Sequence, residues 1–181
     1  MSDVAYLKSL LGVHPDFPKK GIVFLDLFPI LRDPLAFETL ITHFIHHLTS
    51  ETIPKLENKK IDVVVGLDAR GFLLGPVLAM RLNCGFVPIR KKGKLPGQVV
   101  GAEYVKEYGT DVFEIQADSI KPDQNVIVID DLIATGGSAK AAGELVDKLG
   151  AKVIEYLFLI EVSFLKGSQH LNAPTYAMIK D

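Results

Sequence analysis

VIVIDDLIATGGS, from Val126 to Ser138, is the stretch that decides what fold the chain can adopt. Its first four residues are apolar and β-branched, which predicts a strand buried on both faces, and we expect this strand to end at Asp130. The Thr-Gly-Gly-Ser run then opens a helix, whose apolar spacing continues to Leu149 before Gly150, a residue typical of helix C-termini. A buried strand followed directly by an amphipathic helix predicts one unit of a parallel sheet.

Strands and helices alternate in the same way along the rest of the chain. A short helix is predicted at 1–11, a longer one from the N-cap Asp33 to about Ser50, further helices at 72–82 and 139–149, strands at 61–66, 84–89 and 152–160, and a loop at 90–101. The alternation predicts an α/β fold with a doubly wound, mainly parallel sheet flanked by helices. Because ligands of such sheets bind beyond the carboxyl ends of the strands, we expect a site there.

The composition points to one domain with a small-molecule partner. The 181 residues are 48% hydrophobic and 23% charged, enough for one substantial core, and the net charge near −2 gives no field that would favour nucleic acid or an acidic membrane. The single cysteine, Cys84, excludes an internal disulfide and is expected to be buried and inert. The amino terminus lacks signal-peptide features and no apolar run is long enough to span a membrane, so we expect a cytoplasmic protein.

The turn after the predicted strand that begins at Val126 has the composition of a phosphate-binding site. Gly136 and Gly137 let backbone N–H groups approach an anion, Thr135 and Ser138 add hydroxyl donors, and the helix N-terminus favours negative charge. Asp130 and Asp131 precede the turn, where carboxylates can accept hydrogen bonds from ribose hydroxyls. An ordinary helix cap is the alternative for TGGS alone, but the paired aspartates favour a ribose-phosphate site. The chain has neither a Walker loop nor a G-x-G-x-x-G motif.

Two further segments add positive charge at the same edge of the predicted sheet. GLDARG, at 66–71, follows the strand at 61–66 and offers the Arg70 guanidinium, which can bind a phosphate at two points. RKKGKLPG, at 90–97, follows the strand at 84–89, although such basic runs are often only solvated. His43, His46 and His47 have the spacing of metal ligands, but we expect them on the solvent face of their helix. Two separated anion sites suggest a ligand with phosphates at both ends.

With these motifs the chain resembles the type I phosphoribosyltransferase family. The quoted stretch resembles the family's phosphoribosyl-diphosphate signature, and GLDARGF, IRKKGKLPG, EYG, HPDFPKKGIVFLD and LKG resemble the members that use adenine. The resemblance implies transfer of the 5-phosphoribosyl group from 5-phospho-α-D-ribose 1-diphosphate to adenine, forming AMP and diphosphate in purine salvage. It also implies Mg²⁺, a homodimer, and a single domain over 1–181 with an N-terminal hood at about 1–33 and a flexible active-site loop at about 90–110.

The resemblance implies a role for each site residue. Glu107, Tyr108 and Arg70 are the catalytic residues, with Glu107 handling the purine proton and Tyr108 excluding water. The 5′-phosphate and ribose are bound by Asp130, Asp131, Ala134, Thr135, Gly136, Gly137 and Ser138, the diphosphate by Asp68, Ala69, Arg70, Arg90, Lys91 and Lys94, and adenine by Val23, Phe24, Leu25 and Val162. Mg²⁺ is expected to bind through the ligand, with Asp130 as a protein contact through water.

The chain departs from the family pattern at two positions. Leu25 stands where many relatives carry a basic residue, which leaves purine selectivity open, and Ala69 replaces the commoner serine. The family's loop further suggests that the Asp68–Ala69 peptide is strained or cis. Two alternative functions remain at this point: a ligand-binding regulator on the same fold, and an enzyme for hypoxanthine or guanine.

Overall fold

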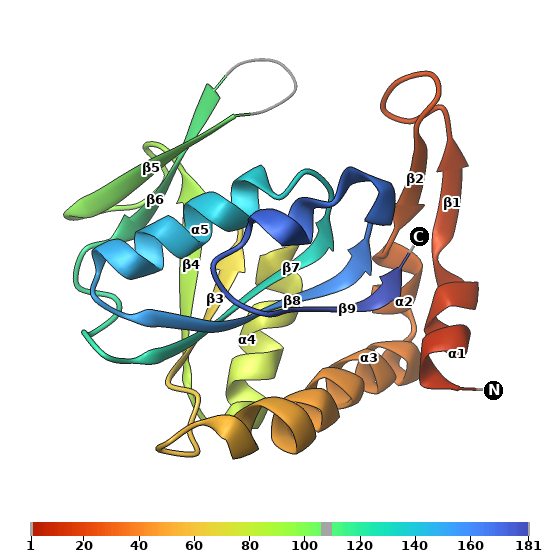
Figure 1. Cartoon of the computed structure of the whole chain (residues 1–181). Helices are drawn as coiled ribbons and strands as arrows, with labels where there is room; N and C mark the ends of the chain where they lie inside the picture. The colour runs from red at the N-terminus through yellow and green to blue at the C-terminus, as the bar shows by residue number, and fades with distance from the viewer. Residues whose placement is uncertain (1, 106–109, 181) are drawn as a thin grey trace. The chain divides into compact units, whose positions relative to one another are not determined.

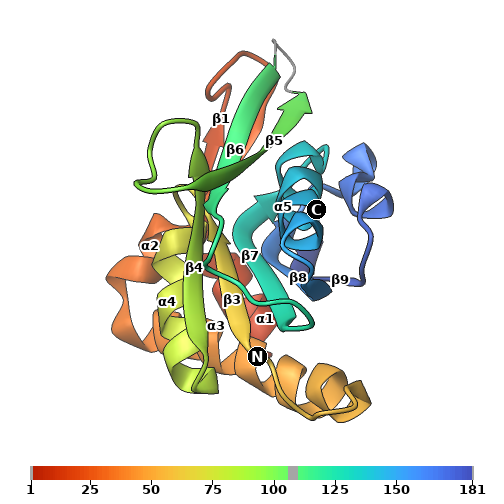
Figure 2. The ribbon, with the colours of Figure 1, turned by 90° about the vertical axis from the view of Figure 1, so that its left-hand side faces the viewer.

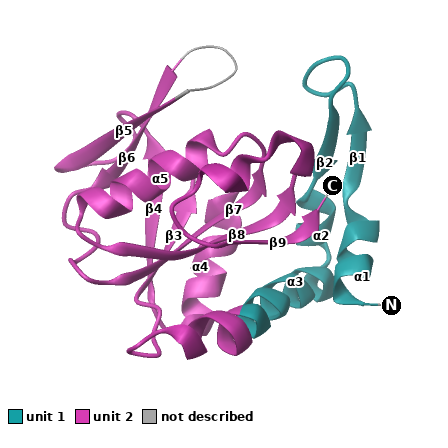
Figure 3. Ribbon diagram, in the orientation of Figure 1, with its two compact units in different colours: residues 1–47 teal, residues 48–181 magenta. Residues whose placement is uncertain are grey.

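A computed structural model of the chain describes residues 2–105 and 110–180. The chain divides into two compact units, Met1–His47 and Leu48–Asp181, which Figure 3 distinguishes by colour. No helix within the described residues is long and apolar enough to cross a membrane.

The smaller unit contains three helices and one hairpin. Its elements are α1 (Asp3–Leu10), β1 (Gly12–Pro15), β2 (Val23–Asp26), α2 (Phe28–Arg32) and α3 (Pro34–His47). The expected cap of α3 is confirmed, because the Asp33 carboxylate accepts the backbone N–H groups of Leu35 at 2.9 Å and Ala36 at 3.2 Å. The helix ends at His47, earlier than expected, where the winding widens to the π-helix η1 (Leu48–Thr52).

The hairpin β1–β2 was not expected from the sequence. The strands pair antiparallel, with Gly12 opposite Asp26 and Pro15 opposite Val23. Between them the Asp16 carboxylate accepts the backbone N–H of Gly21 at 2.6 Å, so a side chain closes the turn.

The solvent exposure of the histidines of α3 was only partly predicted. His46 is exposed, but His43 and His47 are half-buried. No group of three or more His, Cys, Asp or Glu residues in the described part of the chain could hold a metal ion.

The larger unit is built on a seven-stranded sheet (Figure 1). Its elements are η1, η2 (Ile53–Lys55), β3 (Val63–Leu67), α4 (Gly71–Leu82), β4 (Gly85–Lys91), β5 (Val99–Val105), β6 (Thr110–Gln116), β7 (Asn125–Ile133), α5 (Gly137–Lys148), β8 (Lys152–Glu161), η3 (Ser163–Leu165), η4 (Gly167–His170) and β9 (Thr175–Lys180). The strand order is β5-β6-β4-β3-β7-β8-β9. The strands β4, β3, β7, β8 and β9 pair in parallel, whereas β5 and β6 add an antiparallel ribbon, so the expected mainly parallel sheet is confirmed.

Helices α4 and α5 cover opposite faces of this sheet (Figure 2). Alternation along β7 assigns the faces: Val126 and Val128 belong to the core cluster that contains the buried side of α5, while the Ile129 side chain lies near Gly75 of α4. All five residues of β3 are buried, as a strand covered on both faces requires.

Three expectations for this unit were wrong. The strand expected to end at Asp130 continues to Ile133, because β8 pairs with β7 as far as Ile133 opposite Glu161. The loop expected at 90–101 is only a turn at 92–98, because β4 reaches Lys91 and β5 begins at Val99. Cys84 is half-buried rather than fully buried, and this burial raises the pKa of its thiol.

Candidate active site

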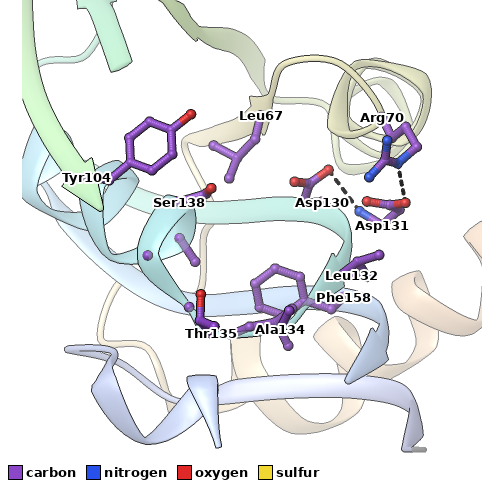
Figure 4. A pocket seen from close by; sticks show the side chains of 14 residues that line it. Leu67, Arg70, Tyr104, Asp130, Asp131, Leu132, Ala134, Thr135, Ser138 and Phe158 are labelled. Carbon is purple, nitrogen blue, oxygen red and sulfur yellow. Dashed lines mark hydrogen bonds and ion pairs between the residues drawn. The ribbon is translucent and has the colours of Figure 1, made fainter. Parts of the chain in front are cut away.

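A cavity of about 270 Å³ opens at the carboxyl end of β7 (Figure 4). Its walls come from the strands β3, β5, β7 and β8, from Arg70, and from the turn between β7 and α5 together with the first residues of α5. They are formed by Leu67, Arg70, Tyr104, Asp130, Asp131, Leu132, Ile133, Ala134, Thr135, Gly136, Gly137, Ser138, Ala139 and Phe158. The position agrees with the sheet edge expected from the alternating sequence.

The overhang of β7 beyond β3 explains how the cavity forms. β3 pairs with β7 only as far as Gly66 opposite Ile129, whereas β7 continues along β8 to Ile133. The side of β7 that faces β3 is therefore open from Asp130 onward, and the segment after β3 fills part of this space with Arg70. Successive side chains of a strand point to opposite faces, so Asp130 and Asp131 cannot share one environment.

Asp131 is the buried member of the pair. Its side chain is 2% exposed and its Oδ2 accepts a hydrogen bond from Nε of Arg70, whose side chain is 40% exposed. Figure 4 shows this ion pair at the wall of the cavity. The other oxygen, Oδ1, is buried with no hydrogen-bond partner among the described residues. A buried carboxylate oxygen without a donor is costly, so a ligand that supplies a donor or a cation there is favoured.

Asp130 is half-buried, and its carboxylate accepts the backbone N–H of Asp131 at 2.9 Å. Burial raises the pKa of Asp130 well above its ordinary value, and the neighbouring charge of Asp131 raises it further. The hydrogen bond from the Asp131 backbone and the charge of Arg70 act in the opposite direction. The protonation of Asp130 thus depends on its surroundings in the site.

The turn from β7 into α5 contains residues 134–138, which we call the phosphate cup because phosphate binding was predicted for them. Gly136 is the N-cap of α5 with φ +83°, a backbone conformation that favours glycine. The first N–H groups of α5 have no partner within the helix and face outward, as an anion site at a helix N-terminus requires. Gly167 packs directly behind the cup, where a Cβ would lie 2.2 Å from the Ala134 carbonyl oxygen and 2.7 Å from the Gly136 nitrogen.

The predicted diphosphate-binding residues fall into two groups. Arg70 lines the cavity. The other five do not line it and belong to the loop after β3, to β4 and to the turn after β4: Asp68, Ala69, Arg90, Lys91 and Lys94. Arg90 Nε donates to the Asp68 carboxylate at 2.9 Å, which joins the loop after β3 to the end of β4. The Asp68–Ala69 peptide is cis, which confirms that expectation. Lys91 Nζ lies 3.9 Å from the Asp111 carboxylate.

The remaining predicted residues lie elsewhere. Val23, Phe24 and Leu25 form most of β2 in the smaller unit, where the rings of Phe17 and Phe24 meet edge to face at 5.3 Å. Val162 is a half-buried residue at the end of β8 in the larger unit. Glu107 and Tyr108 lie outside the described residues.

Tyr104 is a cavity residue that the sequence interpretation missed. Its ring is buried, lies 4.5 Å from the ring of Phe113, and forms one wall of the cavity above Ser138 (Figure 4). Its hydroxyl donates to the Asp111 carboxylate at 3.3 Å. The apolar residues Val100, Ala102 and Tyr104 at every second position are a strand signal in the sequence, but the basic, Gly- and Pro-containing run before them favours a loop.

Leu67 and Phe158 line the cavity and were also missed. Both are apolar residues within strands, so the sequence gives no local signal that separates them from the rest of the core. Their contribution is an apolar wall, which excludes water from one side of the cavity.

The oxygen donors of the cavity fit a magnesium ion held mainly by its ligand. Mg²⁺ prefers oxygen and is usually bound through one or two carboxylates together with substrate phosphates. Asp130 opens to the cavity, and Asp131 has an oxygen without a partner among the described residues, which together provide such a donor set. The described residues contain no cluster that would bind the metal without a phosphate ligand.

Comparison with known proteins places this site in a defined class. Residues 36–173 match the model of the phosphoribosyl transferase domain. Adenine phosphoribosyltransferase of Kluyveromyces lactis is 56% identical over 173 residues, which are 96% of this chain and 90% of that protein. The chain therefore belongs to the adenine phosphoribosyltransferase family.

Solved structures agree in fold. Adenine phosphoribosyltransferase of Saccharomyces cerevisiae, complexed with D-2,5-dideoxy-2,5-imino-altritol 1,6-bisphosphate and adenine, superimposes with a TM-score of 0.93 at 52% identity, covering 97% of this chain and 98% of that one. The Trypanosoma brucei enzyme, in complex with AMP, pyrophosphate and ribose-5-phosphate, gives a TM-score of 0.88 at 29% identity, covering 99% and 80%.

Proposed function

We infer that the protein transfers the 5-phosphoribosyl group from 5-phospho-α-D-ribose 1-diphosphate to adenine, forming AMP and diphosphate. The observation that carries this function is the joining, in one cavity, of the phosphate cup, the Asp130–Asp131 pair and the Arg70 guanidinium. The cup suits a single phosphate, the aspartates suit the hydroxyls of a sugar, and Arg70 suits a second anionic group. The family relationship supplies the identity of the base.

The chemistry we propose needs no covalent nucleophile. As the bond from C1′ to the diphosphate breaks, an adenine nitrogen bonds to C1′ and positive charge develops on the sugar. Asp130 and Asp131 lie where they can stabilise this charge, and Arg70, Arg90, Lys91 and Lys94 stabilise the departing diphosphate. The Asp130 carboxylate would hold Mg²⁺ through water together with the ligand's phosphates, and the ion would supply positive charge at the leaving group.

The roles of the remaining predicted residues are part of this proposal. Val23, Phe24, Leu25 and Val162 bind adenine, with residues 1–33 as the hood over the base. Glu107 relays the purine proton, and Tyr108 excludes water as the segment 90–110, which includes the turn at 92–98 and β5, closes over the substrates. We also propose a cytoplasmic homodimer, which sedimentation equilibrium and cell fractionation can check.

A purine panel tests the function. The purified protein is mixed with the phosphoribosyl donor, Mg²⁺ and adenine, hypoxanthine or guanine, and diphosphate release and nucleotide formation are followed. We expect turnover with adenine, and a kcat/KM for the other two bases lower by a factor of about 100 or more, since a site that hydrogen-bonds one purine edge leaves groups unpaired with another. Turnover of hypoxanthine or guanine above that of adenine overturns the assignment of the base, and no turnover with any of the three overturns the function.

A further inference from the structure

Glu114 is a buried carboxylate beside the basic turn at 92–98. It lies on β6, is 8% exposed, and its Oε2 accepts the backbone N–H of Gly93 at 2.8 Å. Two other buried glutamates have different surroundings, because Glu155 accepts from Thr52 and Glu161 from Ser168. Burying a carboxylate is unfavourable unless it gains strong hydrogen bonds, so a buried Glu114 must be held tightly by the donor it faces.

Gly93 is the point at which the chain reverses direction after β4. Its φ is +78°, and the turn is closed by the N–H of Lys94, which donates to the Lys91 carbonyl at 3.2 Å. The N–H of Lys92 donates to the Val112 carbonyl at 3.0 Å, which ties the turn to β6. Glu114 therefore fixes the middle of a segment whose two ends carry Lys91 and Lys94.

The same turn holds the Arg90 guanidinium. Arg90 Nη1 donates to the Lys94 carbonyl at 3.3 Å, Nε donates to Asp68 at 2.9 Å, and Cζ lies 5.8 Å from the centre of the Phe72 ring. Because the Lys94 carbonyl follows directly after Gly93, a shift of the Gly93 amide moves one of the groups that orient Arg90. A guanidinium held by a carboxylate, a carbonyl and a ring has a defined orientation, as bidentate recognition of phosphate requires.

We propose that Glu114 is a positioning residue for the diphosphate-binding side chains: by holding the Gly93 amide it sets the positions of Arg90, Lys91 and Lys94. This inference rests on the proposed function, in which these three cations bind the diphosphate end of the donor substrate. It assigns no contact between Glu114 and the substrate, since a carboxylate facing diphosphate would repel it. The phosphate cup at 134–138 contains none of these residues, so binding of the 5′-phosphate is independent of Glu114.

Three variants and one control test this role. Glu114→Leu removes the acceptor, Glu114→Asp keeps the charge but withdraws it by one methylene, and Glu114→Gln keeps an uncharged acceptor oxygen in place. Asp118→Ala removes an exposed carboxylate shortly after β6 and serves as the matched control. Calorimetry with Mg²⁺ gives the dissociation constants of diphosphate and of ribose 5-phosphate, and steady-state kinetics gives separate KM values for the phosphoribosyl donor and for adenine.

We expect Glu114→Leu and Glu114→Asp to weaken diphosphate binding about tenfold and to raise the KM for the phosphoribosyl donor by a similar factor. This is the range expected for losing a hydrogen bond to a charged group. Binding of ribose 5-phosphate and the KM for adenine stay within about twofold of the unmodified protein. Glu114→Gln retains most of the diphosphate affinity of the unmodified protein. Asp118→Ala binds diphosphate as the unmodified protein does. If Glu114→Leu does not fold, Glu114→Asp decides.

Two results would overturn the inference: equal weakening of diphosphate and ribose 5-phosphate, or unchanged diphosphate binding in both Glu114→Leu and Glu114→Asp. The binding experiments need no turnover. An unmodified protein that binds diphosphate but transfers nothing to adenine contradicts the proposed function, while the effect of Glu114 on diphosphate binding is still measured.

Discussion

Two adjacent aspartates with different surroundings are the centre of this site. Asp131 is buried and bound to Arg70, whereas Asp130 is half-buried at the cavity and has a raised pKa. The alternation of a β-strand is the physical reason, because it sends neighbouring side chains in opposite directions. Asp131 is therefore suited to fixing Arg70, and Asp130 to meeting the ligand and its metal.

The raised pKa of Asp130 predicts a pH-dependent effect of Asp130→Asn on stability. A carboxyl group whose pKa is higher in the folded than in the unfolded state binds more protons when folded, so its contribution to stability falls as pH rises from the ordinary value of 3.8 through the folded pKa. Asparagine has no titrating carboxyl group, so the stability of Asp130→Asn does not fall with rising pH for this reason. We expect its Tm to exceed that of the unmodified protein at pH 8, and the difference to shrink steadily towards pH 5. A difference that is constant with pH would contradict the environment described for Asp130.

The Arg70–Asp131 ion pair predicts a larger effect of Asp131→Asn. Breaking a fully buried ion pair costs about 3–5 kcal/mol, and because Arg70 is partly exposed we expect about 1–2 kcal/mol in urea unfolding at pH 7. Asp111→Asn is the control, since the pair of Asp111 with Lys91 is more exposed and longer, and should change stability by less than about 0.5 kcal/mol. Equal effects of the two substitutions would show that Asp131 is not held as described.

Contacts between elements explain the phosphate cup better than its own sequence does. The cup is backed by Gly167 at the start of η4, and the two backbones lie too close for any side chain between them. The cup and Gly167 are far apart in the sequence, yet they form one packed layer. The η4 helix thus supports residues 134–136 of the predicted phosphate cup, although none of its residues lines the cavity.

Gly167→Ala tests this packing. The added Cβ would lie 2.2 Å from the Ala134 carbonyl oxygen, so the cup must move. We expect binding of ribose 5-phosphate to weaken at least about tenfold, with little change in diphosphate binding, because the diphosphate side chains lie on other elements. Gly85→Ala, whose Cβ would be 3.8 Å from its nearest neighbour, the Asp62 carbonyl oxygen, is the control. Unchanged binding of ribose 5-phosphate in Gly167→Ala would exclude the supporting role of η4.

The central elements could be predicted because their sequence patterns agree with their surroundings. β3, β7 and α5 have apolar spacing that matches a strand buried on both faces and a helix with one buried stripe. The continuation of β7 through Asp130 and Asp131 could not be predicted, because pairing with β8 overrides the low strand propensity of Asp. The Arg70–Asp131 contact joins residues 61 positions apart and has no local signal.

The β5–β6 ribbon was missed for a different reason. The basic, Gly- and Pro-containing run before it favours a loop, and the strand pattern in Val100, Ala102 and Tyr104 is short. The strands of the hairpin β1–β2 and the last strand, β9, are likewise only four and six residues long. Short antiparallel and edge strands depend on partners distant in the sequence, which a single sequence does not reveal.

At the scale of the whole molecule, the chain combines a near-neutral charge with a site for a strongly anionic ligand. The net charge is −2, and Arg70, Arg90 and Lys91 each lie near a carboxylate, those of Asp131, Asp68 and Asp111. These three cations are therefore presented as compensated pairs, whereas Lys92 and Lys94 of the turn at 92–98 are exposed. Affinity for the phosphoribosyl donor must therefore come from short-range contacts that form once the donor has reached the cavity.

This compensation has a consequence for how fast the donor substrate arrives. Electrostatic steering can raise association rates by about 10–10³-fold, but it needs uncompensated charge at the protein surface, and salt screens that charge beyond about a Debye length. Stopped-flow measurements in about 0.01 M and about 0.1 M salt, between which the Debye length falls from about 30 Å to about 10 Å, should give association rate constants that differ by less than about threefold. A tenfold fall would mean that the cations act at long range, and that the paired carboxylates do not mask them. Because these cations are paired with carboxylates, we expect the donor to reach the site by diffusion without electrostatic steering, with an association rate constant nearly independent of ionic strength.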